Sequence, residues 1–106
     1  MKIIVFTSNS YLYLLPGFCE LFNKYWPNQG VTVLGYNKLE YKLPDNFSFI
    51  SLGQEPGNQY WTNGLIPYFT DLNDKYFIII LDDFFLIDYV NQDILEYLFD
   101  ITKFIY

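Results

Sequence analysis

Short apolar runs alternate along the chain with segments whose apolar residues recur every three or four positions. Residues 2–7 (Lys-Ile-Ile-Val-Phe-Thr) form a continuous run rich in β-branched side chains. Such a run predicts a strand that is buried on both faces of a sheet. Residues 31–36, 47–52 and 76–81 predict three more strands, and the last of these is as apolar as the first. The pattern therefore indicates a sheet of four strands.

The segments between these strands have the spacing of amphipathic helices. Residues 15–25 place leucine and aromatic side chains at intervals of three and four, which predicts a helix that ends at the turn-forming residues 27–30. Residues 59–72 predict a second helix, weakened by a glycine and a proline. Residues 90–104 predict a third, with its acidic residues on the opposite side from its apolar ones.

The resulting order, β-α-β-β-α-β-α, predicts an α/β fold with three layers, α/β/α, around a mostly parallel sheet. A length of 106 residues fits a single domain spanning residues 1–106. In such folds ligands bind beyond the carboxyl ends of the strands, where the strand order reverses. If the first and fourth strands are neighbours, the segments that follow residues 7 and 81 converge at one site.

Composition and charge exclude several classes of function. The chain carries 12 acidic and 6 basic residues, a net charge of −6, and all six basic residues are lysines. Binding to nucleic acid requires a basic patch, so DNA and RNA are not expected as partners, and an acidic surface disfavours anionic membranes. No stretch approaches the roughly 20 apolar residues of a transmembrane span. Cys19 is the only cysteine, which fits a reduced, cytoplasmic setting, and the absence of histidine excludes sites that depend on it.

Asp82 and Asp83 are the sharpest candidates for chemistry, because an apolar run ends in these two carboxylates. Hard cations such as Mg²⁺ and Mn²⁺ favour carboxylate ligands and combine a few of them with substrate phosphates. Adjacent strand residues face opposite ways, so both serve one ligand only if the chain turns there. Capping or solvation at the end of a strand is the alternative interpretation, and the spacing does not decide between them.

Two further segments hold candidate ligand contacts. Thr7, Ser8 and Asn9 belong to a polar loop after the first strand, which can hydrogen-bond a base, ribose or phosphate but can equally cap the next helix. Trp61 can stack on a ligand, although a tryptophan in so aromatic a chain is more often core. Asn63 can shape a pocket or act as a cap.

Three motifs in register resemble those of the GT-A-type glycosyltransferase-like proteins of bacterial surface-polysaccharide loci and large viruses. The first is Phe-Cys-Glu-Leu-Phe-Asn-Lys-Tyr-Trp-Pro-Asn at residues 18–28. The second, Trp-Thr-Asn-Gly-Leu at residues 61–65, is similar to a Trp-Ser-Asp-(Arg/Lys)-Leu motif. The third is Ile-Ile-Ile-Leu-Asp-Asp-Phe-Phe-Leu at residues 78–86. The resemblance covers nearly the whole chain.

The resemblance implies a Rossmann-like, GT-A half that binds a nucleotide-diphospho-sugar donor with Mn²⁺ or Mg²⁺. Asp82 and Asp83 would then contact the metal and ribose, while Thr7 and its neighbours line the nucleotide pocket. The chain departs from the family at Asn63 and Gly64, where the family has an aspartate and a basic residue, and its acidic pair is not a strict Asp-x-Asp.

Enzymes of this type also have an acceptor-binding half, which residues 1–106 leave no room for. The expectation is therefore a chain that is either truncated before the acceptor half or has that half on a partner chain. Such a chain is inactive in transfer by itself and is expected to form homo-oligomers or to pair with the partner. The alternative is a non-catalytic interaction protein that keeps the fold without the chemistry. A flavodoxin-like or receiver-like module fits less well, because receivers carry their acidic pair after the first strand.

Overall fold

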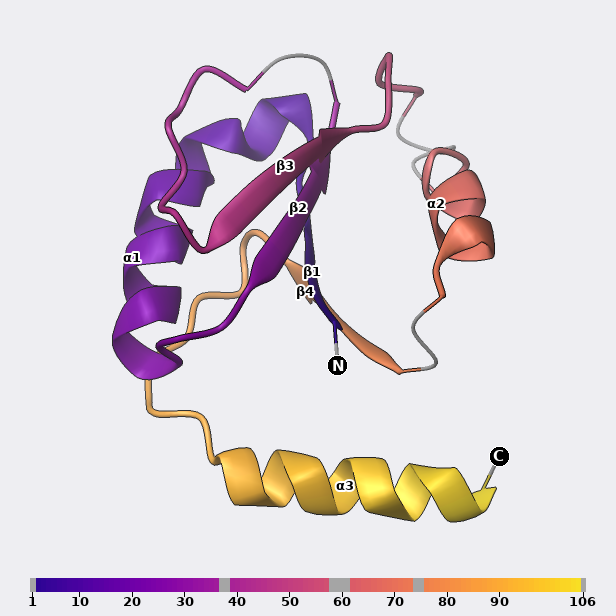
Figure 1. Ribbon diagram of the computed structural model, residues 1–106. Helices are drawn as coiled ribbons and strands as arrows, with labels where there is room; N and C mark the ends of the chain where they lie inside the picture. Colours follow the sequence, from indigo (N-terminus) through magenta and orange to yellow (C-terminus); the bar gives the residue numbers. More distant parts are fainter. Residues whose placement is uncertain (1, 37–38, 58–61, 74–75, 106) are drawn as a thin grey trace.

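The computed structural model of the chain describes residues 2–36, 39–57, 62–73 and 76–105. These residues form a four-stranded, all-parallel sheet of β1 (Lys2–Phe6), β2 (Val31–Gly35), β3 (Phe47–Ser51) and β4 (Phe77–Leu81). The order across the sheet is β3-β2-β1-β4 (Figure 1). The α/β class and the parallel sheet are therefore confirmed, and the layout is compatible with a Rossmann-like fold.

Alternation along the central strand β1 divides the core between the two faces of the sheet. Ile3 and Val5 belong to a cluster with the first helix, whereas Ile4 and Phe6 belong to a cluster with Leu65 on the other side. All four side chains are buried, as the continuous apolar run predicts. The strand is therefore covered on both faces, and its carboxyl end is held in a fixed position between β2 and β4.

Helix α1 (Leu15–Tyr25) covers one face of the sheet with its apolar stripe, which buries Leu15, Phe18, Cys19 and Phe22. Burial raises the pKa of the Cys19 thiol to about 11, so this cysteine acts as a packing residue and not as a nucleophile. The preceding segment, expected as a polar loop, is instead a 3₁₀ helix, η1 (Asn9–Leu14). Pro16 explains the change of helix type, because its ring clashes with the carbonyl four residues earlier in a continuous α-helix.

Helix α2 (Leu65–Asp71) lies on the opposite side of the sheet from α1 (Figure 1). It is shorter than predicted, since residues 62–64 form a turn and residues 59–61 lie outside the described part of the chain. Pro67 lacks a backbone N–H and is tolerated only in the first helical turn, so the helix has to begin just before it.

Strand β4 differs from the prediction of a fully buried strand. It is the outermost strand next to β1, and its residues alternate between half-buried and exposed. Ile78 and Ile80 pack against the core on the α1 side, whereas Phe77, Ile79 and Leu81 are 38%, 47% and 38% exposed. The alternation arises because α1 reaches β4 while α2 leaves most of its other face uncovered.

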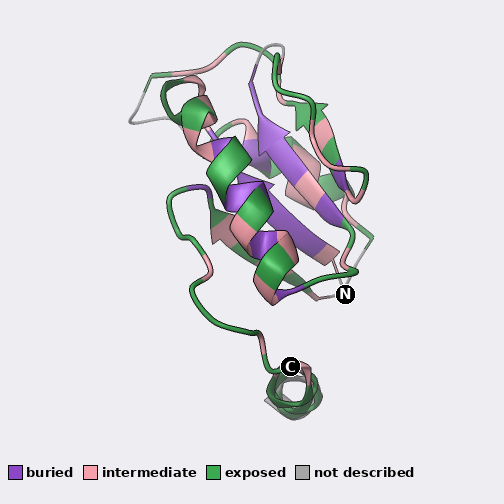
Figure 2. Cartoon of the chain, turned by 90° about the vertical axis from the view of Figure 1, so that its left-hand side faces the viewer, coloured by how far each residue is buried: buried purple, intermediate pink, exposed green. Residues whose placement is uncertain are grey.

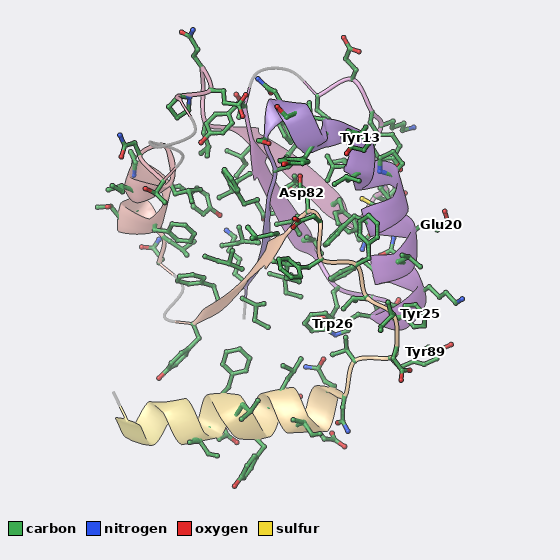
Figure 3. All side chains as sticks on the ribbon, turned by 180° about the vertical axis from the view of Figure 1, so that it is seen from behind. Tyr13, Glu20, Tyr25, Trp26, Asp82 and Tyr89 are labelled. Carbon is green, nitrogen blue, oxygen red and sulfur yellow. The ribbon has the colours of Figure 1, made fainter. Side chains whose placement is uncertain are left out.

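Beyond β4 the chain returns along the α1 side before entering helix α3 (Gln92–Ile105). The Val90 N–H donates to the Tyr25 carbonyl at 3.1 Å, and the Tyr89 ring meets the Tyr25 ring edge-on at 5.2 Å (Figure 3). The Trp26 indole N–H donates to the Gln92 side chain at 3.0 Å. These contacts fix the start of α3 beside the end of α1. The helix itself extends away from the sheet and is exposed along most of its length (Figure 2).

The described helices do not include one that is both long enough and apolar enough to cross a membrane.

Candidate functional site

The carboxyl ends of β1 and β4 lie side by side at the point where the strand order reverses. From β1 the chain proceeds outward to β2 and β3, and it then returns to the other side of β1 as β4. Phe6 is in register with Leu81 of β4 and with Leu34 of β2. This arrangement is the switch point at which open parallel sheets bind ligands. It confirms that the segments after residues 7 and 81 converge.

Thr7 and Asp82 form the centre of this region. Each is anchored by one more backbone hydrogen bond past its strand, since the Thr7 N–H donates to Leu34 and the Asp82 N–H donates to Phe6. The Thr7 hydroxyl donates to Asp82 Oδ2 at 2.6 Å, a bond between residues 75 positions apart in the sequence. Thr7 is 1% exposed and Asp82 is 6% exposed. A charge-assisted bond in such a buried place holds the carboxylate in one orientation.

Burial raises the pKa of the Asp82 carboxyl above its ordinary value, and the neighbouring charge of Asp83 acts in the same direction. The Thr7 hydroxyl and backbone N–H groups oppose this rise, since they stabilise the charged form. A buried carboxylate with these opposing influences accepts hydrogen bonds strongly when it is ionised.

The chain turns directly after Asp82, so that both carboxylates serve the same cavity. The Phe84 N–H donates to the Leu81 carbonyl at 3.1 Å and closes the turn. Asp82 and Asp83 both line the pocket, although Asp83 is exposed whereas Asp82 is buried. The condition under which adjacent residues of a strand end can share one ligand is therefore fulfilled.

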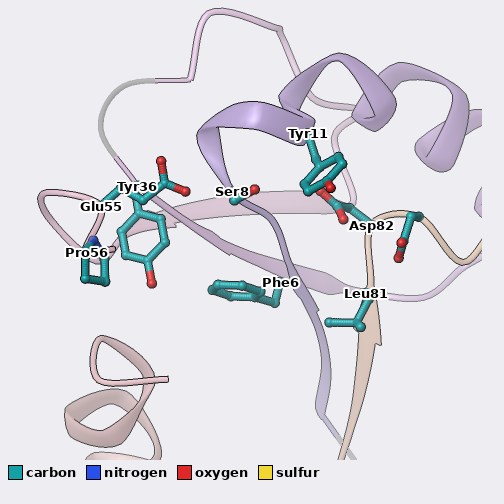
Figure 4. A pocket seen from close by; sticks show the side chains of 9 residues that line it. Phe6, Ser8, Tyr11, Tyr36, Glu55, Pro56, Leu81 and Asp82 are labelled. Atoms are coloured by element: carbon teal, nitrogen blue, oxygen red, sulfur yellow. The ribbon is translucent and has the colours of Figure 1, made fainter. Parts of the chain in front are cut away.

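The pocket at this edge of the sheet has a volume of about 230 Å³. Its walls are mostly apolar, with Phe6, Tyr11, Tyr36, Pro56 and Leu81, and its polar groups belong to Ser8, Glu55, Asp82 and Asp83 (Figure 4). Pockets for drug-sized ligands commonly have about 300–1,000 Å³. The cavity therefore suits one ring system of a larger ligand and leaves the remainder outside.

Glu55 is held across the mouth of this pocket by the segment that begins η1. The Asn9 N–H donates to Glu55 Oε1 at 3.3 Å. Beside Glu55, burial and the charge of this carboxylate raise the pKa of the Tyr36 hydroxyl (Figure 4). The Phe6 and Tyr36 rings meet edge to face, with centroids 6.0 Å apart. The pocket thus combines flat aromatic surfaces with carboxylates at its edge.

Only some of the other residues predicted at the site lie at the pocket. Ser8 lines the pocket, and its side chain makes no capping bond to η1. Asn9 contributes its backbone to the site, while its side chain lines a separate hollow beside Leu12 and Tyr13. Asn63 is exposed in the turn before α2 and does not line this pocket. Trp61 lies outside the described residues.

Gly64 brings the second motif next to the pocket. A Cβ atom at this position would lie 3.2 Å from the Tyr36 hydroxyl oxygen and 3.3 Å from Tyr36 Cε1. The turn before α2 therefore packs against a pocket wall, and a larger side chain at position 64 would compete with Tyr36 for the same space.

The sequence analysis missed Glu55, Tyr36 and Tyr11 as pocket residues. Tyr36 directly follows β2, so the argument from strand ends applies to it as well as to Thr7 and Asp82. Glu55 is the only acidic residue in the turn-rich segment 53–58, but the bond that carries it to the pocket comes from a residue 46 positions away. Sequence alone gives no signal for that contact.

The carboxylates at the pocket fit a divalent ion only in part. Within the described residues no group of three or more His, Cys, Asp or Glu side chains could enclose a metal. Mg²⁺ frequently binds through one or two carboxylates and takes its other ligands from water and substrate phosphates. Asp83 is exposed at the pocket and has the right chemistry for such a shared site. Asp82 already accepts the Thr7 hydroxyl.

Comparisons with protein-family models, with curated proteins and with solved structures give no significant match to this chain.

Proposed function

We propose that this chain is a glycosyltransferase-like domain that binds a nucleotide-diphospho-sugar donor, together with Mg²⁺ or Mn²⁺, in the pocket between β1 and β4. A three-layer, GT-A-type arrangement is part of this proposal. The observation that carries it is the hydrogen bond from Thr7 to Asp82, which joins the polar segment after β1 to the acidic pair after β4 at the switch point of the sheet. The motif resemblance and the shape of the pocket support the same ligand class.

In this proposal the base, the ribose and the diphosphate of the donor occupy different parts of the site. The base or ribose occupies the aromatic part of the pocket, where Phe6, Tyr11 and Tyr36 offer flat surfaces. Ribose hydroxyls donate to Asp82 and Glu55, whose carboxylates are acceptors when ionised. The diphosphate lies outside the cavity next to Asp83, because the pocket volume of about 230 Å³ leaves no room for the whole ligand.

Charge makes the metal necessary for this arrangement. Three carboxylates and no lysine are among the described residues that line the pocket, so the site repels a free diphosphate. Asp83 would hold a divalent ion there, which would supply the positive charge that a diphosphate needs as ligand and as leaving group. Binding of the nucleotide should therefore depend on the metal. The contacts to the base and ribose do not themselves involve the metal.

Thermal unfolding with UDP, GDP and CDP and their sugar forms, with and without Mn²⁺, tests the proposal. A ligand that binds only the folded state stabilises it by about 2.7 kcal/mol at one hundred times its dissociation constant. We expect one base to raise the unfolding temperature, and to do so only with Mn²⁺. Asp83→Ala should abolish this shift, while Glu20→Ala, which removes an exposed carboxylate from α1, should leave it intact.

The alternative is a non-catalytic interaction protein with the same fold. The specific observation in its favour is the exposed apolar surface on β4 and α3, where Ile79 is 47% and Tyr97 is 65% exposed. If none of the nucleotides shifts the unfolding of a well-folded sample, donor binding is excluded for this chain and the interaction protein becomes the better account.

A further inference from the structure

The face of β4 on the α2 side is incompletely covered. Parallel sheets are normally covered by helices on both faces. Here Phe77 stacks on Phe69 of α2 at 4.9 Å, but Ile79 and Leu81 remain 47% and 38% exposed. The free edge of β4 also lacks the charges and prolines by which edge strands usually avoid association, since its sequence is Phe-Ile-Ile-Ile-Leu. This face of β4 is therefore suited to contact with another apolar surface.

Helix α3 presents an apolar stripe that covers nothing within the described part of the chain. Its side chains are Ile94, Tyr97, Leu98 and Ile101, which are 55%, 65%, 50% and 37% exposed. At 3.6 residues per turn these four lie within roughly 100° of the helix circumference. Leu95 and Phe99 lie on another side and contact the rest of the chain. The helix thus has one inward stripe and one outward apolar stripe.

The outward stripe of α3 does not cover the bare face of β4 within the same chain. Tyr89 and Val90 bind the end of α1, and Gln92 accepts the Trp26 indole N–H. All these contacts lie on the α1 side of the sheet, whereas Ile79 and Leu81 face the α2 side. Figure 1 shows α3 running below the sheet from the side of α1 toward the side of α2, so the chain leaves both this sheet face and the outward helix stripe uncovered.

We propose that a second copy of the chain covers this surface, in a two-fold contact in which α3 of each copy packs on the bare β4 face of the other. A two-fold contact requires a surface that is complementary to itself. A helix stripe and a sheet face exposed on the same chain satisfy this requirement, because each copy both donates and receives the same kind of cover.

The size and charge of the surface also fit a second copy. Covering the exposed parts of Phe77, Ile79 and the α3 stripe, while Leu81 stays in the pocket wall, removes on the order of 550 Å² per copy, or about 1,100 Å² in total, just above the roughly 1,000 Å² expected of a specific interface. Of the acidic residues of α3, Glu96 lies on the far side of the helix from the apolar stripe, whereas Asp93 and Asp100 flank the stripe at its Tyr97 edge. In a contact centred on the stripe, these carboxylates stay at the rim, in water.

The mass in solution tests the proposal directly. Light scattering coupled to size exclusion, at chain concentrations of about 1 to 100 µM, should give twice the mass of the chain at the upper end, since association depends on protomer concentration. Ile94→Lys should raise the dissociation constant at least tenfold. Ile66→Lys is the matched control, because Ile66 is an equally exposed isoleucine, at 61%, on α2. A single-chain mass throughout the range, or equal association of both variants, would overturn the proposal.

Cross-linking tests the arrangement of the two copies. Chains carrying Ile79→Cys are mixed with chains carrying Leu98→Cys under mild oxidation, and the buried Cys19 does not compete. The proposed contact predicts a mixed disulfide between the two kinds of chain. Disulfides formed only between Ile79→Cys copies would indicate pairing of β4 edges and would overturn the exchange of α3.

Discussion

Replacement of Thr7 by valine tests the bond on which the candidate site depends. The two side chains have nearly the same shape, but valine lacks the hydroxyl that donates to Asp82 Oδ2 at 2.6 Å. Thr7 is 1% and Asp82 is 6% exposed, so water cannot readily take the place of the lost donor. The variant therefore leaves a buried carboxylate with one partner fewer.

The size of the effect follows from the charge of the acceptor. A hydrogen bond to a charged group contributes roughly 1.5–3 kcal/mol to stability, so Thr7→Val should lower the free energy of unfolding by about 2 kcal/mol at neutral pH. For a domain of this size that corresponds to a fall of about 10 °C in the unfolding temperature. The pKa of Asp82 should also rise further, since the hydroxyl favours the charged form.

The loss should shrink when Asp82 is protonated. Near pH 3.8, the ordinary pKa of this carboxyl, burial keeps the group mostly neutral. A bond between neutral groups contributes only about 1 kcal/mol, so the difference between wild type and Thr7→Val should fall to about half.

Urea unfolding at the two pH values, followed by tryptophan fluorescence, measures these differences. Thr7→Ser is the control, because it keeps the hydroxyl and loses a methyl group, which costs about 1 kcal/mol independently of pH. If Thr7→Val is as stable as the wild type, or loses the same amount at both pH values, the bond to an ionised Asp82 does not stabilise the fold as argued.

Two further predictions concern the same strand ends. Because the pKa of Asp82 is raised in the folded state, its contribution to stability is complete below the ordinary value of 3.8 and is lost as the pH rises through the raised value. As the pH rises from 3.8 to neutrality, the free energy of unfolding of the wild type should therefore fall relative to that of Asp82→Asn, as measured by urea titration. The same pH dependence in both proteins would contradict this sign. Gly35→Ala should lose about 1–3 kcal/mol, since the new Cβ would lie 2.7 Å from the Phe49 ring and 2.9 Å from Thr7 Cγ2. An alanine variant with unchanged stability would show that these neighbours move aside freely.

Local pattern was sufficient to predict the strands and the order of the elements, whereas the convergence of the segments after residues 7 and 81 was predicted only on the condition that their strands are neighbours. The strands are short β-branched runs between turn residues, and the strand-end argument needs only that β1 and β4 be neighbours. The 3₁₀ helix was not predicted. Its sequence is polar at the start and apolar at the end, and the effect of Pro16 on this preceding segment is not visible in that pattern. The position of α2 was missed in part because the weak helical spacing extends beyond the turn at residues 62–64.

The exposure of β4 could not be predicted from its sequence. A run of Phe-Ile-Ile-Ile-Leu is apolar at every position, so it has the pattern of a strand buried on both faces. Whether a strand is central or outermost depends on which strands pair with it, and that depends on contacts far apart in the sequence. The difference between the fully apolar sequence of β4 and its exposed face is informative, because it indicates that this face is covered by something other than the sheet and its own helices.

The departure at Gly64 follows from the same packing that forms the pocket. Tyr36 is almost completely buried, and its hydroxyl would lie 3.2 Å from a Cβ atom at position 64. Any side chain at this position would therefore press against Tyr36, which would have to shift by a few tenths of an ångström to make room for the Cβ atom. With Tyr36 present, the described lining of the pocket holds carboxylates but no lysine. A diphosphate ligand then needs its counter-charge from a metal at Asp83. For this reason the dependence on Mn²⁺, more than the affinity itself, discriminates between a donor site and an apolar hollow.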